Sequence, residues 1–198
     1  MVMQAEWSIE CGAGDPVLVV PWAADDATVK YIDLRTDPDA IEEISEADNH
    51  PALLHALRAI NAQRSPVFTA KCDAWPLDAT ELAALLFDLG DSVHDPVAGY
   101  AGYIDLVWRD RAIFLSRHHH QQLMNRIERL AAPLDRPAAK LEGTLRHCFL
   151  DFDAPQEGFC LTLYVKAVGT SPDEAYANWA AALEDVAALI RRREMATL

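Results

Sequence analysis

Two strand-like segments and one long amphipathic helix follow one another between residues 145 and 190. Residues 145–152 and 159–168 alternate apolar and polar side chains, as strands of a half-buried antiparallel sheet do. The turn-like segment 153–158 joins them, so the pair predicts a hairpin. Ser171 then caps a helix whose apolar stripe recurs every three or four residues: Tyr176, Trp179, Leu183, Val186 and Ile190. Because such a stripe must be buried, this part of the chain predicts a helix packed against an antiparallel sheet.

The earlier part of the chain contains the same two kinds of element. Helices are expected at residues 51–60, 78–89 and 116–130, where apolar stripes follow capping residues or a proline. Strands are expected at residues 7–11, 17–20, 28–34, 67–73, 100–108 and 112–115. Helices that follow hairpins, rather than alternate with single strands, favour an α+β fold over a doubly wound fold. We therefore expect antiparallel sheet with four main helices packed on one side.

The length and composition fit a single domain over residues 1–198. The chain is 51% hydrophobic and 24% charged, which is close to the average for folded domains, and a chain of this size buries roughly 70% of its unfolded surface. The word Tyr-Ile-Asp-Leu occurs at residues 31–34 and again at 103–106, each time near a hairpin and a helix. An alternative is therefore a pair of lobes, 1–92 and 99–198, that are pseudo-duplicated ββαβ(β)α halves.

Acidic residues dominate the first half of the sequence. The formal net charge is −14, and residues 1–99 hold 18 acidic and 5 basic side chains, against 13 and 12 in residues 100–198. Such a surface repels nucleic-acid phosphates and anionic lipid, so we expect neither nucleic acid nor a membrane as a partner. No apolar stretch approaches the ~20 residues that cross a bilayer, and no secretory signal pattern is visible. The four cysteines form no CxxC pair. We expect a cytoplasmic protein with reduced thiols.

The known motifs for catalysis and cofactor binding are missing from the sequence. There is no Gly-x-Ser-x-Gly, no Walker loop and no Gly-x-Gly-x-x-Gly after a strand, so no cofactor is expected. His118, His119 and His120 are adjacent. Neighbouring residues of a helix point about 100° apart, so the three cannot bind one ion from a regular helix. We interpret them as the polar first turn of a helix in which His120 packs inward.

One face of the predicted hairpin gathers the residue types that line ligand sites. We expect residues 148, 150 and 152 to share the apolar face with residues 161, 163 and 165. The opposite face then carries an imidazole, a carboxylate, a phenol and an ammonium, a mixture typical of binding sites and also of half-solvated sheets. An adjacent strand at 67–73 would extend this face. The candidate ligand-binding residues are His147, Asp151, Thr162, Tyr164, Lys166 and Lys71.

The polar loop after residue 90 is a candidate metal site. Asp91, His94 and Asp95 place two carboxylates and an imidazole within a short loop, and such groups bind divalent ions. Their spacing matches no metal motif, so we favour the alternative that these residues form a solvated linker with a helix cap.

The sequence supports two functional hypotheses. The first is a non-catalytic binding or regulatory domain that engages a basic protein partner through the acidic stretch 33–48, or that self-associates through tryptophans near strand ends. The second is a small-molecule-binding protein or enzyme with its site around His147, Tyr164 and Lys166. Salt-sensitive association favours the first hypothesis. A concave pocket where these three side chains converge favours the second.

Overall fold

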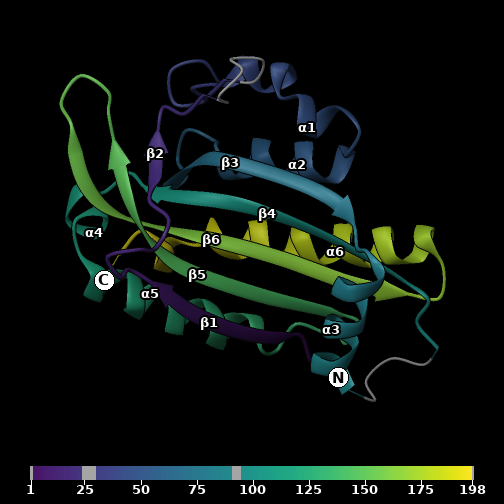
Figure 1. Ribbon diagram of the computed structural model, residues 1–198. Helices are drawn as coiled ribbons and strands as arrows, with labels where there is room; N and C mark the ends of the chain where they lie inside the picture. The colour runs from purple at the N-terminus through teal and green to yellow at the C-terminus, as the bar shows by residue number, and fades with distance from the viewer. Residues whose placement is uncertain (1, 24–29, 91–94, 198) are drawn as a thin grey trace.

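Six strands form one sheet (Figure 1). The computed structural model describes residues 2–23, 30–90 and 95–197. The strand order is β1-β5-β6-β4-β3, and β2 also pairs with β5. The strands are β1 (Gln4–Glu10), β2 (Leu18–Val20), β3 (Val67–Pro76), β4 (Ala98–Trp108), β5 (Ala139–Leu150) and β6 (Gln156–Gly169).

The pairing is antiparallel through most of the sheet, but β1 and β2 run parallel to β5. Gln4 pairs with Lys140 and Leu18 with Cys148, so the two short strands lie end to end along one edge of β5. Parallel strands cannot be joined by a tight hairpin, and the long stretch of chain between β2 and β5 provides the connection. The α+β class is confirmed, and the expected antiparallel pairing is corrected at this edge.

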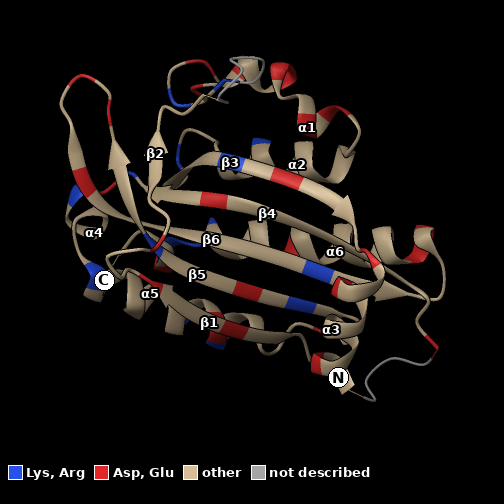
Figure 2. Ribbon diagram, viewed as in Figure 1, with Lys and Arg blue, Asp and Glu red and all other residues tan. Residues whose placement is uncertain are grey.

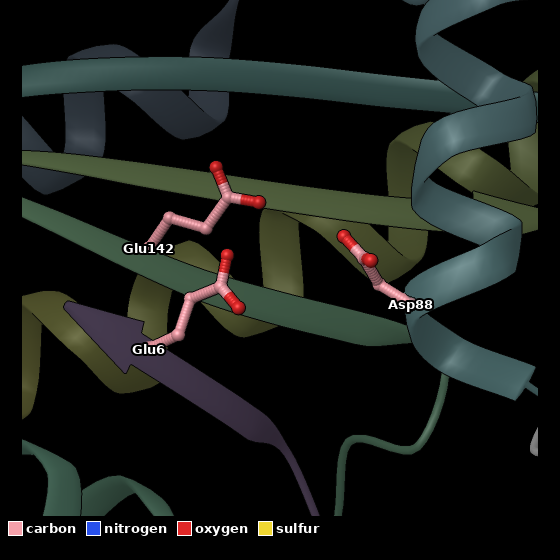
Figure 3. A group of neighbouring side chains, drawn as sticks. All are labelled: Glu6, Asp88 and Glu142. Carbon is pink, nitrogen blue, oxygen red and sulfur yellow. The ribbon is translucent and has the colours of Figure 1, made fainter. Parts of the chain in front are cut away.

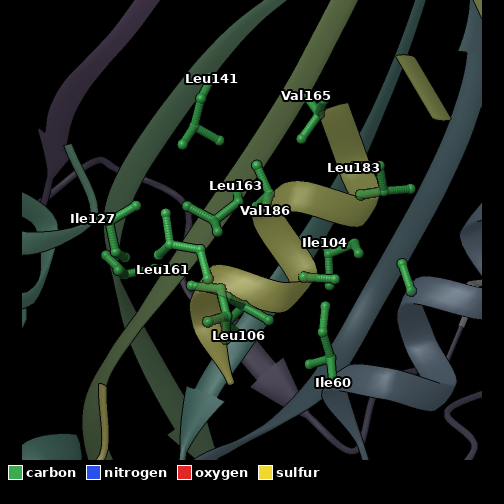
Figure 4. Packing of buried hydrophobic residues seen from close by; sticks show 14 of the residues in the cluster. Ile60, Ile104, Leu106, Ile127, Leu141, Leu161, Leu163, Val165, Leu183 and Val186 are labelled. Carbon is green, nitrogen blue, oxygen red and sulfur yellow. The ribbon is translucent and has the colours of Figure 1, made fainter. Parts of the chain in front are cut away.

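Three long helices cover one face of the sheet (Figure 1). They are α2 (Pro51–Ile60), α5 (Arg117–Ala131) and α6 (Pro172–Ile190), and each buries an apolar stripe. Leu161, Leu163 and Val165 of β6 belong to this core, as predicted. Figure 4 shows them near Leu183 and Val186 of α6. Successive side chains of a strand point to opposite faces, so the residues between them lie on the other side of the sheet.

That other side, which we call the open face, is covered at its two ends. At one end α3 (Ala79–Leu89) packs Leu85 and Leu89 on Val168 of β6, so it lies across the sheet from the other three long helices. At the other end, β2 and the short helix α4 (Arg111–Phe114) help to close a second apolar cluster. Its buried members are Leu18, Val20, Phe68, Ala70, Val107, Phe114, Cys148, Leu150 and Cys160. Between these ends, charged residues lie along β1, β3, β4, β5 and β6 (Figure 2).

Short helices complete the described chain. η1 (Pro38–Glu43) and α1 (Ser45–Asp48) lead into α2 near β3, and η3 (Arg193–Met195) follows α6. Residues 112–115, expected as a strand, instead contribute to α4. The Asp110 carboxylate accepts hydrogen bonds from the backbone N–H groups of Ala112 and Ile113, which starts a helical turn there. None of the helices in the described residues combines the length and apolar composition that a bilayer-spanning segment needs.

Strands from both predicted halves share the sheet. β1, β2 and β3 come from the first half, and β4, β5 and β6 from the second. The repeated four-residue word lies in β4 at 103–106, whereas residues 31–34 belong to no strand, and the predicted strand 28–34 begins outside the described residues. The duplication therefore stays a prediction.

Candidate functional site

Three of the predicted ligand-binding residues lie together on the open face. Thr162, Tyr164 and Lys166 occupy alternate positions of β6; Thr162 is buried and the other two are half-buried. Lys71 of β3 lies within electrostatic reach of this group, because its charge acts on Asp105 of β4. Its ammonium is 4.7 Å from the centre of the Trp22 ring.

His147 and Asp151 are not part of this group, which corrects the prediction. His147 pairs with Phe159 on the helix-covered side, and their ring centroids are 5.1 Å apart. Asp151 follows the end of β5 and is exposed in the connection to β6. The register places Cys148 and Leu150 on the open face, where β2 packs against them. Their apolar character had suggested the opposite face.

A buried carboxylate, Asp105 of β4, lies next to Thr162 on the open face. Asp105 is only 5% exposed, and the Thr162 hydroxyl donates a hydrogen bond of 2.5 Å to it. Burial raises the pKa of Asp105 to about 6, although the Thr162 hydrogen bond and the charges of Arg146 and Lys71 act in the opposite direction. Carboxyl groups with such a raised pKa are frequent in functional sites. The sequence analysis missed this residue, although a single acid within the apolar run 104–108 was a visible signal.

Aromatic rings border Asp105 on the neighbouring strands. Tyr103 and Tyr164 face each other across β4 and β6 with ring centroids 5.7 Å apart, and Trp75 of β3 lies 6.3 Å from Tyr103. Burial, followed by the negative charge of Asp105, raises the pKa of Tyr103, so its hydroxyl keeps its proton. This row of rings can pack against an apolar or a cationic group.

The charged groups at the α3 end of the open face are paired with one another. The ammonium of Lys140 lies 2.6 Å from carboxylate oxygens of both Glu6 and Asp88, and 3.0 Å from Glu142. Glu142 also binds Lys166 at 2.5 Å. Burial acts to lower the pKa of Lys140, but its hydrogen bonds to the three carboxylates raise that pKa above the ordinary value.

The three carboxylates around Lys140 lie close enough together to hold a metal ion (Figure 3). Lys140 is only 2% exposed, however, and its ammonium offers three N–H donors to the three acids. A divalent ion would have to displace that ammonium. We therefore interpret the group as an ion-pair cluster that ties β1, β5 and α3 together.

The predicted metal loop and the predicted inward packing of His120 have different outcomes. Asp91 and His94 of the predicted metal loop lie outside the described residues, and Asp95 is exposed. His120 is buried, as predicted, and the structure places it beside Trp108, with ring centroids 5.3 Å apart. Its Nδ1 lies 3.0 Å from the carbonyl oxygen of Ser116, which can only accept, so Nδ1 carries the proton. Burial lowers the pKa of His120 to about 4, so the ring is neutral.

A cavity of about 240 Å³ lies beside β3, the last strand at one edge of the sheet. Its lining joins the outer edge of β3 to η1 and α1, and it carries side chains of both charges: Trp22, Lys30, Ile32, Leu34, Glu43, Ile44, Ser45, Glu46, Thr69, Ala70, Lys71 and Cys72. Burial, followed by the charge of Glu46, raises the pKa of Cys72 to about 12. That thiol stays protonated and is a poor nucleophile.

The acidic segment, defined here as residues 37–48, forms the outer side of this cavity. Its exposed carboxylates are Asp37, Asp39, Glu42, Glu43 and Asp48. Among the described residues, Arg58 is the one cation that pairs with this segment, at 3.1 Å from Glu42, and both partners are exposed. Asp33, at the start of the predicted acidic stretch, is instead paired with Arg35 at 2.8 Å. Within the predicted stretch 33–48, the negative charge without a partner therefore lies in residues 37–48.

Comparisons with protein-family models, with curated proteins and with solved structures found no match. The functional argument therefore rests on the geometry and the charges described above.

Proposed function

We propose that this protein is a non-catalytic binding module that engages a basic protein partner through its acidic segment. The observation that carries the proposal is the group of five exposed carboxylates in residues 37–48, of which Glu42 alone has an ion-pair partner among the described residues. Unpaired surface charge of one sign raises the rate and the specificity of association with a surface of the opposite sign.

The pairing of charges elsewhere supports the choice of this segment. On the open face, Lys140, Lys166 and Arg146 each already bind carboxylates of the same chain, at 2.5–3.0 Å. A charged partner would have to break these internal pairs in order to bind there. In the acidic segment, four of the five exposed carboxylates have no ion-pair partner among the described residues, and the Glu42–Arg58 pair that would exchange is itself exposed.

The test measures binding of a fluorescent deca-lysine peptide by anisotropy, at low and at high salt. The triple variant Asp39→Asn, Glu43→Gln, Asp48→Asn removes three exposed carboxylates from the segment. We expect it to lose at least about tenfold in affinity, or about 1.4 kcal/mol. The wild-type affinity should also fall steeply as salt is added.

A second triple variant is the matched control for net charge. The changes Asp151→Asn, Asp153→Asn and Glu157→Gln remove three exposed carboxylates around the connection between β5 and β6. We expect this variant to bind within about twofold of the wild type, because the Debye screening length is only about 8 Å at physiological salt. Equal losses in both triple variants would mean that net charge, and not the acidic segment, attracts the peptide, and the proposal would fail.

A second candidate function is a small-molecule site on the open face. The specific observation in its favour is the buried Asp105, with Tyr103 and Tyr164 beside it and a hydrogen bond from Thr162. This function predicts that a ligand shifts the NMR signals of both tyrosines and binds less tightly to Asp105→Asn. A partner at the acidic segment should leave those signals unchanged.

A further inference from the structure

β3 has a free edge, at which a strand of a binding partner can pair. β3 pairs with β4 on one side, and among the described residues no strand pairs with it on the other. The register of β3 shifts between Thr69 and Cys72, and the same four residues, 69–72, line the cavity. Unpaired backbone groups at a sheet edge are a template for an added strand.

Trp22 occupies part of this edge. Its indole Nε1 donates a hydrogen bond of 2.8 Å to the backbone carbonyl of Ala70. The ammonium of Lys71 lies 4.7 Å from the centre of the same ring. The indole thus supplies one N–H donor to an edge carbonyl, which is the interaction that the backbone of an added strand would supply.

The charges around the cavity indicate which kind of strand would fit. Glu43 and Glu46 line the side formed by η1 and α1, and the acidic segment holds four further exposed acids. The two cations of the lining, Lys71 of β3 and Lys30, do not belong to η1 or α1. A segment that pairs with β3 presents alternate side chains on the two faces of the sheet. Basic residues at alternate positions therefore suit a strand that runs beside these carboxylates.

We propose that an extended basic segment of the partner adds to the free edge of β3 and displaces the indole of Trp22 from the Ala70 carbonyl. This inference rests on the proposed function, because it takes the partner to be basic. It adds to that function a way of recognising the partner, through hydrogen bonds between the backbones of two strands. The competing explanation is that Trp22, Lys71 and the irregular register protect the edge from unwanted pairing, and the experiment separates the two.

The probe is the acetylated and amidated heptapeptide Lys-Val-Lys-Val-Lys-Val-Lys, together with two analogues of equal charge. One analogue is N-methylated at every valine and the other at every lysine. In an added strand, alternate N–H groups point to the same edge, so only one analogue loses the donors that face β3. We expect that analogue to bind at least about tenfold more weakly than the parent peptide, while the other stays within about threefold.

Trp22 provides a second measurement on the complete chain. With 15N-labelled tryptophan, the indole signal that is absent from Trp22→Phe identifies this residue, and the parent peptide should shift it. Loss of affinity in both analogues or in neither overturns strand addition, and so does an unmoved Trp22 signal.

The results also distinguish this inference from the proposed function. If all three peptides bind equally and the acidic-segment variant weakens them all, the proposed function stands and strand addition is wrong. If none of the peptides binds and deca-lysine also fails to bind, the proposed function is wrong as well.

Discussion

Replacement of Asp105 by asparagine should stabilise the protein at neutral pH and have little effect at about pH 3.5. The side chain is 5% exposed, and its burial raises the pKa from the ordinary 3.8 to about 6. The folded state therefore binds the Asp105 proton more tightly than the unfolded state does. Its contribution to the free energy of unfolding is fully present below the unfolded pKa and is lost as the pH rises through the folded pKa.

The expected magnitude follows from the two pKa values. Each pH unit between them is worth about 1.4 kcal/mol, so ionisation of Asp105 costs about 3 kcal/mol at pH 7. Asparagine keeps an oxygen that can accept the Thr162 hydrogen bond but does not ionise. The variant should therefore exceed the wild type in free energy of unfolding by about 3 kcal/mol at pH 7, and by close to zero below pH 4.

Urea denaturation at a series of pH values measures this difference directly. Other titrating groups, including His120, are present in both proteins and cancel when the two curves are subtracted. Asp73→Asn is the matched control, because that carboxylate is exposed on the strand next to Asp105, and it should change stability by less than about 0.5 kcal/mol. The reasoning would be refuted by a stability difference between the two proteins that does not vary with pH. It would also be refuted if the wild type became more stable relative to the variant above pH 6.

Three other predictions test the packing, the ion pairs and the burial of His120. A Cβ atom on Gly143 would lie 1.6 Å from the Trp7 ring, so Gly143→Ala should lower the free energy of unfolding by about 2 kcal/mol or more. Gly14 has open space around it, so Gly14→Ala should leave that free energy almost unchanged. Equal losses of stability in the two variants would contradict the close packing of Gly143 on Trp7. Lys140→Met should cost about 3 kcal/mol at pH 7, because three carboxylates lose their shared cation. That cost should shrink near pH 4 in thermal melts, and a constant cost would argue against carboxylate repulsion. The lowered pKa of His120, about 4, means that its stabilising contribution is lost as pH falls from about 6.5 toward 4; NMR should find the ring neutral at pH 5.5, and a charged ring there would contradict the burial argument.

The helices and the core face of β6 could be predicted because their patterns are local. The apolar stripe of α6 and the alternation of Leu161, Leu163 and Val165 each follow from a single segment. The start of α4 was also encoded locally, in the Asp110 cap, but the short apolar run after it was interpreted as a strand. Short apolar runs do not distinguish a strand from a helical turn.

The face of His147 could not be predicted because it depends on elements that are distant in the sequence. Along β5 the buried apolar positions change from Leu141 and Leu145, on the side covered by the long helices, to Cys148 and Leu150, which lie on the open face in the apolar cluster that contains Phe114 of α4. Both faces of the strand are covered near this point, so the alternation of apolar residues no longer identifies the core side. Asp105 and the cavity beside β3 depend on the same long-range assembly.

The pairing of β1 and β2 with β5 has a consequence for biosynthesis. Residues 4–10 and 18–20 find their partners at residues 140–146 and 148–150. A ribosome makes β1 and β2 long before it makes β5. The first strands of the chain to be synthesised are therefore among the last to pair. Until then, Trp7 and Val20 have no β5 to pack beside, and a nascent chain cut short of residue 139 cannot form this edge of the sheet.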